Sequence, residues 1–545
     1  MRFVPSGSTW VSVFAVAVAA AAVFAAVASV AQQPQPSPTF DILEFQIEGN
    51  SVLSVREIER AVTPFLGLKK RFEDVEGARK ALEDTYQKSG YQTVFVDIPE
   101  QKVVGGVIRL RVAEGRVDRL RVTGSRHYEL GEIRSRAESL APGSVPDFNQ
   151  VQQDLAQLNR MPDRQVSPIL TPGSTPGTID VDLSVKDRLP LHGDLEVDNY
   201  ASPFTTNLRT NASLHYDNLW QAQHSLALNY QVAPEKPSEA NVIYATYLWR
   251  FQESDDAISV YGIRSNSDVA VVGSSTILGN AKIAGVRWVR PIGSGMAGSS
   301  SYFNSITFGI DRKDFAQTNV SALTGQAAIL PQVTYTPLSL TYGGTLVSEA
   351  GTAQVSFGVT TAPRGFFGNS DAAFRGRRVL GDASWVAWKL DASIERWLAK
   401  PLSGFAKFGG QWTTDPLIPN EQFITGGADS VRGYRESEIS GDRGFHATME
   451  MRWYPIGRPS FDGRHTLYVL AFVDGAQVQL VDPAGPQIPL TSIASAGLGV
   501  RVQGWYGIHG ALDLARTLRN GGHGVDGFIT PSGVNRVDAS LGVSF

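Results

Sequence analysis

The stretch that decides the fold is VDASLGVSF, residues 537–545 at the end of the sequence. Apolar side chains stand at every second position from Val537 to Phe545, and polar residues or glycine fill the positions between them. This alternation is typical of a β-strand with one apolar and one polar face. An apolar face that ends in an aromatic ring is typical of a strand that faces lipid and reaches the aromatic girdle of a membrane.

The region that precedes this strand shows the same pattern. Residues 208–216 and 243–251 also alternate, and residues 190–545 show no sustained helical period. A soluble β-sandwich would show the same alternation. This region is longer than a usual sandwich, however, and its apolar face continues to the last residue. We therefore predict a transmembrane antiparallel β-barrel over residues 189–545.

The composition limits the kinds of function that the chain can have. Its 545 residues are too many for a single ordinary core, so two or more domains are expected. The absence of cysteine excludes a disulfide framework, a thiol nucleophile and a thiolate metal site. The 49 basic and 53 acidic residues leave a net charge of −4, which gives no indication of nucleic-acid binding.

The beginning of the chain has the pattern of a secretory signal peptide. Arg2 precedes a long run without charge that ends in the small-x-small sequence Ser29-Val30-Ala31. An uncleaved anchor helix is the alternative, because about 20 apolar residues can span a bilayer. We predict a signal peptide at residues 1–31 and a Pro/Gln-rich linker at residues 32–39. No later segment is long and apolar enough for a transmembrane helix, so further membrane insertion must use strands.

Residues 40–188 carry a mixed α/β pattern that occurs twice. The predicted elements of the first copy are a strand at 42–47, helices at 55–66 and 75–89, and strands at 93–98 and 107–112. Those of the second copy include a strand at 120–122, a helix at 147–158 and a strand at 179–185. Gly124 corresponds to Gly49, so the period is 75 residues. We therefore predict two tandem β-α-α-β-β domains, at residues 40–115 and 116–188.

Short motifs in all three regions carry a family resemblance. The first α/β copy contains Tyr86, Gly90-Tyr91-Gln92-Thr93, Pro99-Glu100-Gln101 and Val112-Ala113-Glu114-Gly115. The second contains Leu158-Asn159-Arg160, Pro162, Leu170, Pro172-Gly173 and Gly177. The barrel region contains Val197-Asp198-Asn199, Tyr216-Asp217-Asn218-Leu219 and Leu512-Asp513-Leu514-Ala515-Arg516. In this order and spacing, the motifs resemble the two-partner-secretion transporters of the TpsB type (ShlB/FhaC/HecB-like) in the Omp85 superfamily.

The resemblance implies a fold, a location and a function. The α/β copies would be POTRA domains in the periplasm, and residues 189–545 would form a barrel of about 16 strands among the lipids of a Gram-negative outer membrane. The fold class is therefore α+β plus all-β. The partner would be a secreted exoprotein with an N-terminal secretion domain (TpsA-like), which crosses the barrel unfolded. No catalytic residue, metal or cofactor is expected, and the chain is not expected to be an enzyme.

The stretch DSVRGYRE, residues 429–436, interrupts the alternating pattern of the barrel region. In the family that the chain resembles, a VRGY tip lies on a loop that folds back into the barrel. Val431, Arg432, Gly433 and Tyr434 match this tip, and the family links its conformational change to pore opening. Gly433 permits backbone angles that other residues avoid. Arg432 keeps its charge, so inside a barrel it needs an acidic partner.

Asp474 is the predicted partner of Arg432. In HTLYVLAFVDGAQV, alternate residues from Leu467 to Val473 form an apolar face, which places Asp474 and Phe472 on the lumen face. A charge-assisted pair with Asp474 would tether the loop to the barrel wall. The sequence departs from the family pattern F-x-D-x-G, because Gly475 follows Asp474 directly. In the alternative interpretation, Arg432 is a solvated loop charge and Asp474 belongs to a turn.

Other functions are consistent with parts of the sequence. An Omp85-type assembly factor is the first alternative, although such factors typically carry three or more POTRA domains. An outer-membrane hydrolase is an alternative of another class, but the sequence contains neither GxSxG nor HExxH. A simple diffusion porin would leave the α/β units without a purpose. The plug helix of many such transporters has little room before Phe40, so either the plug is absent or the predicted cleavage site is wrong.

Overall fold

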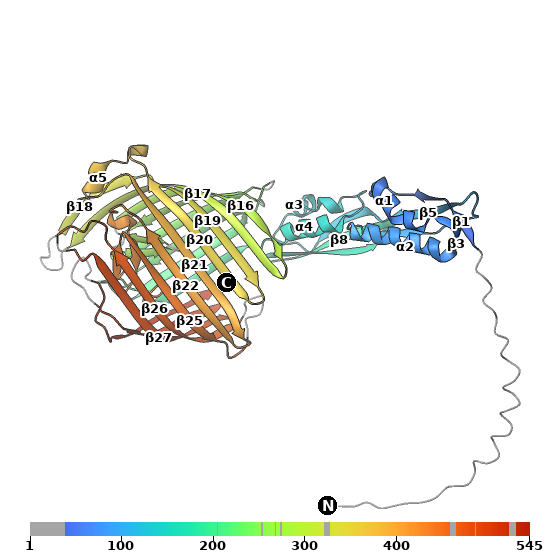
Figure 1. Ribbon diagram of the computed structural model, residues 1–545. Helices are drawn as coiled ribbons and strands as arrows, with labels where there is room; N and C mark the ends of the chain where they lie inside the picture. Colours follow the sequence, from blue (N-terminus) through green and yellow to red (C-terminus); the bar gives the residue numbers. More distant parts are fainter. Residues whose placement is uncertain are drawn as a thin grey trace, which may run out of the picture. The chain divides into compact units, whose positions relative to one another are not determined.

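Figure 1 shows the computed structural model of the protein. The structure describes residues 39–545 with gaps at residues 204, 252–253, 267–268, 273–274, 279, 321–326, 458–464, 486 and 523–529. The predicted signal peptide and residues 32–38 of the predicted linker lie outside the described residues. The chain divides into two compact units, the first ending at Arg188 and the second beginning at Leu189. No helix within the described residues has both the length and the apolar character needed to cross a membrane.

The first α/β copy begins the first unit. Its elements are β1 (Phe40–Ile42), β2 (Glu44–Glu48), α1 (Val55–Val62), η1 (Thr63–Phe65), β3 (Gly67–Lys70), α2 (Phe72–Lys88), β4 (Val94–Asp97) and β5 (Val107–Glu114). Helix α1 starts at a capping box, in which Ser54 and Glu57 each accept the other's backbone N–H. It is shorter than predicted because Pro64 lacks the N–H that would continue the α-helical ladder, and a 3-10 turn follows instead.

The sheet of this copy has the order β2-β5-β4, with β2 parallel and β4 antiparallel to β5. Helix α2 buries Val75, Ala78, Leu82 and Tyr86 against it. Burial, together with the nearby Glu114 carboxylate, raises the pKa of the Tyr86 hydroxyl, which stays protonated and donates to Asn50 Oδ1 at 2.6 Å. The small β1–β3 pair was not predicted, because strands of three and four residues are too short to show a period.

The second copy repeats the order of the first. Its elements are β6 (Arg116–Thr123), α3 (Leu130–Ser135), η2 (Glu138–Leu140), α4 (Phe148–Leu158), β7 (Arg164–Pro172) and β8 (Thr178–Asp187). The sheet order β6-β8-β7 matches that of the first copy. Gly49 and Gly124 have φ angles of +90° and +88°, and a Cβ on either would meet the carbonyl oxygen of Val112 or Val185, respectively. The same close approach therefore explains both glycines.

The second unit is a closed barrel of antiparallel strands, each hydrogen-bonded to its neighbours around the ring (Figure 1). In chain order the strands are β9 (Leu191–Asp198), β10 (Arg209–Leu219), β11 (His224–Val232), β12 (Asn241–Arg250), β13 (Ala257–Ser265), β16 (Asn280–Ala297), β17 (Ser300–Val320), β18 (Ala327–Tyr335), β19 (Leu338–Ser348), β20 (Gly351–Ala362), β21 (Trp385–Ala399), β22 (Leu402–Trp412), β25 (Arg443–Trp453), β26 (Thr466–Gln479), β27 (Leu490–Trp505), β28 (Ile508–Thr517) and β29 (Asn535–Ser544). Connections carry β14 (Val269–Val272), β15 (Ser275–Leu278), η3 (Phe366–Gly368) and α5 (Asp371–Arg375).

Within the described residues the ring has 16 strands, because β18 and β19 are successive segments of one interrupted strand. Strand β18 pairs with residues 313–320 of β17, whereas β19 pairs with residues 301–310. Thr336 and Pro337 separate the two segments, and proline cannot donate to a ladder. The predicted fold class, with an antiparallel barrel of about 16 strands, is confirmed.

The ring closes where β29 pairs with β9, with Ser540 opposite Asp198 and Ser544 opposite Asp194. The side chains of β29 alternate as the sequence predicts. Leu541 is 64% exposed on the outer face, whereas Asp538 is buried on the lumen face. The outer face of the closing strand is therefore apolar, and its inner face offers a carboxylate to the lumen.

Candidate functional site

A long connection between β22 and β25 folds back into the barrel. It contains η4 (Pro419–Glu421) and a hairpin of β23 (Phe423–Thr425) and β24 (Ile439–Gly441), and the VRGY residues lie between these two short strands. Val431 and Tyr434 are fully buried. They cluster with residues of the hairpin and of strands β26 and β27, namely Phe423, Ile439, Ala476, Val478 and Ile493. The tip of the connection, which we call the inner loop (residues 426–438), therefore lies against the lumen wall.

Arg432 is bound to Asp474 by three hydrogen bonds. Its Nε donates to Asp474 Oδ2 and its Nη2 to Oδ1, each at 2.8 Å, and its backbone N–H donates to Oδ2 at 3.1 Å. Arg432 is 3% exposed and Asp474 is 1% exposed. A bidentate pair at such burial fixes both position and orientation, because the planar fork of arginine matches the two carboxylate oxygens.

Further groups surround the same guanidinium. Its Nη1 lies 2.8 Å from Glu450 Oε1 and 3.9 Å from Asp513 Oδ1. Its Cζ stands 3.6 Å from the ring centroid of Phe472, which is a cation–π distance. Arg432 therefore has an aromatic face beneath it and carboxylates at its edges.

Gly433 and Tyr434 hold the tip from two other directions. Gly433 has a φ angle of +87°, and a Cβ there would lie 3.0 Å from the Cβ of Ala515. Its N–H donates to Asp538 Oδ2 at 3.2 Å. The Tyr434 hydroxyl lies 2.9 Å from the carbonyl oxygen of Ala494 and 2.7 Å from that of Arg519. The positive φ angle and the close approach of the tip to β28 both favour glycine at position 433, because a side chain there would be strained.

The carboxylates around the tip belong to a larger network of charges. Glu450, Asp474, Asp513 and Asp538 project from β25, β26, β28 and β29, respectively, and we call these four strands the anchoring wall. The other ion pairs of the network are Arg501–Asp513 and Arg536–Asp538 at 2.7 Å, Arg452–Glu450 at 2.7 Å and Arg452–Glu395 at 2.9 Å. Each wall carboxylate thus has an arginine, and together they stabilise charges that would be costly to bury alone.

Arg432 contacts both Asp474 and Phe472, the two residues that the sequence predicts beside it. Glu450, Asp513 and Asp538 are not among its predicted partners. The alternation of β25 could have indicated Glu450, since Met449 and Met451 on either side of it are exposed to the outside. In the sequence, Asp513 and Asp538 stand only within strand patterns. Their distance in sequence from the VRGY tip gave no signal of the contact.

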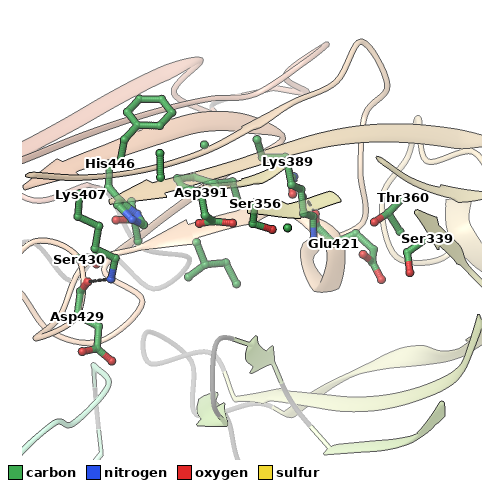
Figure 2. Close-up of a pocket in the computed structure, with 18 of the residues that line it drawn as sticks. Ser339, Ser356, Thr360, Lys389, Asp391, Lys407, Glu421, Asp429, Ser430 and His446 are labelled. Atoms are coloured by element: carbon green, nitrogen blue, oxygen red, sulfur yellow. Dashed lines mark hydrogen bonds between the residues drawn. The ribbon is translucent and has the colours of Figure 1, made fainter. Parts of the chain in front are cut away.

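The lumen beside the inner loop contains a cavity of about 1310 Å³. Side chains of strands β12 to β25 and of the inner loop line it, and many are polar or charged. Figure 2 shows Lys407 of β22 beside Asp429 and Ser430 of the loop, with Lys389 and Asp391 of the neighbouring strand β21 farther along the wall. Lys407 Nζ donates to the carbonyl oxygen of Asp429 at 3.0 Å. The cavity is therefore a water-compatible space with charges of both signs.

The connection between β20 and β21 packs against neighbouring strands and connections. Helix α5 places Phe374 in a buried cluster with residues of β17, β18 and β21. The following Arg377 donates to the carbonyl oxygens of Pro331 and Phe315, at 2.7 and 2.6 Å. Arg378 donates to the carbonyl oxygens of Leu417 and Val481 and pairs with the buried Asp442.

Arg378 therefore ties three connections together at the end of the barrel opposite to the start of β9. Leu417 and Asp442 lie at the two bases of the connection that carries the inner loop, and Val481 follows β26. Asp442 also accepts the N–H groups of Leu417 and Val481. The inner loop is thus fixed at its tip by the anchoring wall and at its base by Arg378.

Two family models match this chain. The model of the haemolysin secretion/activation protein ShlB/FhaC/HecB matches residues 177–502, and the model of the ShlB-type POTRA domain matches residues 40–115. The outer membrane transporter CdiB of Dickeya dadantii (strain 3937) is 25% identical over 459 residues, which cover 81% of this chain and 76% of that protein. The matched relatives are thus transporters.

Solved structures with the same fold include CdiB from Escherichia coli, with a TM-score of 0.64 and 20% identity over 95% of this chain and 92% of that one. BamA from Haemophilus ducreyi, without its POTRA domains 1–3, has a TM-score of 0.53 and 15% identity over 93% and 100%. At these identities the likeness shows the fold alone.

The family match and the barrel agree on the location of the protein. It is an outer-membrane β-barrel with an N-terminal POTRA domain, which lies in the periplasm. The family model covers more than half of the chain and includes most of the barrel. The chain belongs to the haemolysin secretion/activation protein family ShlB/FhaC/HecB, the TpsB transporters of two-partner secretion in the Omp85 superfamily.

Proposed function

We propose that this transporter captures an unfolded exoprotein in the periplasm and passes it through the barrel lumen to the cell surface. The client would carry an N-terminal secretion domain, as the TpsB resemblance implies. The observation that carries the proposal is the division of one lumen between an anchored inner loop and an adjoining polar cavity. A channel that opens for an extended chain needs a loop that can move out of the lumen and a water-filled space beside that loop.

Capture is the first step of the proposed route. We treat residues 116–188 as a second POTRA domain, since they repeat the sheet order of residues 40–115. Strands β4 and β7 lie at sheet edges and carry the exposed apolar residues Phe95 and Ile169. An unpaired edge can accept an extended client as an additional strand, and exposed apolar side chains give that client places to bind.

Passage is the second step. Lys389, Asp391 and Lys407 offer charges of both signs to the cavity, and the serine residues Ser339 and Ser356 also line it. Such a wall can replace the hydration of a passing backbone without holding any one segment tightly. The inner loop must move aside for a continuous path, because its tip is bound to the anchoring wall. Folding of the client outside would then prevent its return.

Photo-crosslinking tests the route directly. A photo-reactive side chain would replace Phe95 or Ser356, or one of the control residues Val104 and Phe357. The crosslinks are formed while the transporter exports a TpsA-like client with an N-terminal secretion domain. Val104 is exposed in the connection between β4 and β5, and Phe357 is 46% exposed on the lipid face next to Ser356. We expect the client to crosslink from positions 95 and 356 and not from 104 or 357. Crosslinks from position 357 alone, or from none of the four, would contradict passage through the lumen.

The same cells distinguish transport from outer-membrane protein assembly. Loss of the transporter is expected to abolish release of the exoprotein while the amounts of other outer-membrane barrels stay unchanged. The opposite result, with lower amounts of resident barrels and normal release, would favour an assembly factor instead.

A further inference from the structure

Three metal-ligating side chains meet where the first barrel hairpin begins. His192 on β9 stands directly opposite His215 on β10, and their ring centroids are 4.9 Å apart. Asp217 lies two residues beyond His215, with its Oδ2 3.3 Å from His215 Nε2. One ligand atom from each of the three residues lies within 4.8 Å of the others. This cluster lies on β9 and β10, outside the anchoring wall, and has no role in the transport route proposed above.

The strand geometry itself brings these side chains together. Residues two apart on a strand share a face, so His215 and Asp217 point the same way. Directly opposed residues on neighbouring strands have Cβ atoms about 4.5–5.5 Å apart, which brings His192 beside them. Leu214, which precedes His215 on the strand, is 44% exposed on the outer face, so His215 and the rest of the cluster face the lumen. The backbone N–H of Asp217 donates to the carbonyl oxygen of Pro190 at 2.9 Å, which fixes the end of the strand next to the cluster.

We propose that His192, His215 and Asp217 form a binding site for a divalent transition metal ion of the Zn²⁺ class. Two imidazole nitrogens and one carboxylate oxygen are the ligand set that such ions prefer, and they leave a coordination position for water. Ligand atoms around tetrahedral zinc stand roughly 3.3 Å apart, since each bond is about 2.0–2.2 Å long. The separation of His215 and Asp217 already meets this requirement, and the His192 ring would have to rotate to close the remaining gap.

The bound ion would crosslink strands β9 and β10. These strands begin the barrel directly after the periplasmic region of the chain, and the ladder between them ends at the pair of Leu191 and Tyr216. A metal bridge at this point would hold the open end of the hairpin. Its free coordination position would face the lumen entrance.

A second cluster of possible ligands, with one histidine, also involves β9, and its metal binding must be distinguished from that of the first. His509 Nε2 on β28 lies 3.5 Å from Asp194 Oδ2 and 3.6 Å from Glu196 Oε2. This cluster holds a single histidine, so it should bind a transition metal more weakly. His224 on β11 provides a matched control, because its Nδ1 lies 2.6 Å from the Tyr247 hydroxyl and it belongs to neither cluster.

The test is a titration of the tag-free, metal-stripped full-length protein in detergent with Co²⁺, followed by its visible absorption. We expect one Co²⁺ per chain, displaced by Zn²⁺. Loss of an outer-shell contact weakens metal binding by about tenfold. We expect a larger loss of Co²⁺ affinity from each ligand variant, namely His192→Gln, His215→Gln and Asp217→Asn. His224→Gln should leave binding unchanged, and His509→Gln should change it less than either histidine variant of the cluster.

Folding of each variant is checked by heat-modifiable migration of the barrel on gels, which reports closure without any metal. The proposal is overturned if no saturable Co²⁺ binding occurs. It is also overturned if the double variant His192→Gln/His215→Gln, with its barrel closed, binds as the parent does. In that case the ion is held by scattered surface groups.

Discussion

Two walls of the same barrel use charge in opposite ways. On the anchoring wall, Arg432 fits between carboxylates at hydrogen-bond distance and is 3% exposed. On the other wall, formed by β16 to β22 and here called the cavity wall, Lys389 and Asp391 face the cavity of about 1310 Å³. Both walls alternate apolar and polar residues in the same manner. The difference lies in whether a charge is paired with the inner loop, as Asp474 is, or faces the cavity, as Lys389 and Asp391 do.

This difference indicates how a loop can be both firmly held and removable. A buried ion pair contributes little net stability against a well-packed apolar pair, but loss of one partner is costly. The ion pairs of the anchoring wall therefore specify one position for the loop. They add little to the free-energy difference between the bound and the displaced loop. The cavity wall leaves room into which the loop, or a client, can move.

The largest expected effect comes from reversing the charge at the centre of the anchoring wall. Asp474→Arg would place two guanidinium groups together, whereas even simple loss of the partner costs about 3–5 kcal/mol at a buried pair. We expect export of the client to fall below detection while the barrel still closes. Release of the client into the medium, with heat-modifiable migration as the control for closure, measures this.

The reciprocal variant Arg432→Asp/Asp474→Arg sharpens the same comparison. It should restore only part of the export, because Glu450 and Asp513 would then face another carboxylate. Full restoration would indicate an isolated pair, and no restoration in a closed barrel would count against a direct Arg432–Asp474 contact.

The base of the inner loop should be the next most sensitive point. Arg378→Ala would leave Asp442, which is fully buried, without its cation, at a cost of about 3 kcal/mol. We expect larger and more frequent conductance openings in planar bilayers. Arg375→Ala is the matched control, since the Arg375 side chain is 61% exposed and lies 3.9 Å from Asp371. Equal conductance of both variants would mean that Arg378 does not hold the loop.

Passage of the client through the cavity is tested by adding bulk to the cavity wall. Ser356→Trp adds a large ring to the cavity, whereas Phe357→Trp adds similar bulk to the lipid face of the same strand. We expect about a tenfold loss of export for the first, equivalent to about 1.4 kcal/mol on the barrier, and none for the second. Export rates at matched amounts of folded barrel measure the ratio. Equal export would place the conduit elsewhere.

The sequence predicted the barrel because a period of two survives in every strand that faces lipid. In the structure Leu541 lies on the outer face and Asp538 on the lumen face, as the alternation in the sequence predicts. The interruption between β18 and β19, by contrast, depends on pairing with two parts of β17, and no local pattern records it. The β1–β3 pair was missed for a related reason, since its short strands depend on each other rather than on their own periodicity.

The candidate site divides in the same way. Asp474 could be named because its strand alternates clearly and one arginine needed an acid. Glu450, Asp513 and Asp538 could not be assigned to the inner loop, since their contacts with it depend on the order of strands around the ring. Alternation tells which residues face the lumen, and only closure of the barrel tells which of them meet.

The smallest expected effect distinguishes two glycines of the anchoring region. Gly433→Ala would force a side chain into a φ of +87° with its Cβ 3.0 Å from Ala515, at a cost of about 1 kcal/mol or a fivefold shift. Gly475→Ala should cost nothing comparable, because a Cβ there would meet only the Ile493 carbonyl oxygen at 3.9 Å. Protease cleavage within the inner loop of the folded barrel measures the shift. If both variants were cleaved alike, the tip would not be held by close contact with β28, and the departure at Gly475 from the family pattern would matter more than the VRGY glycine.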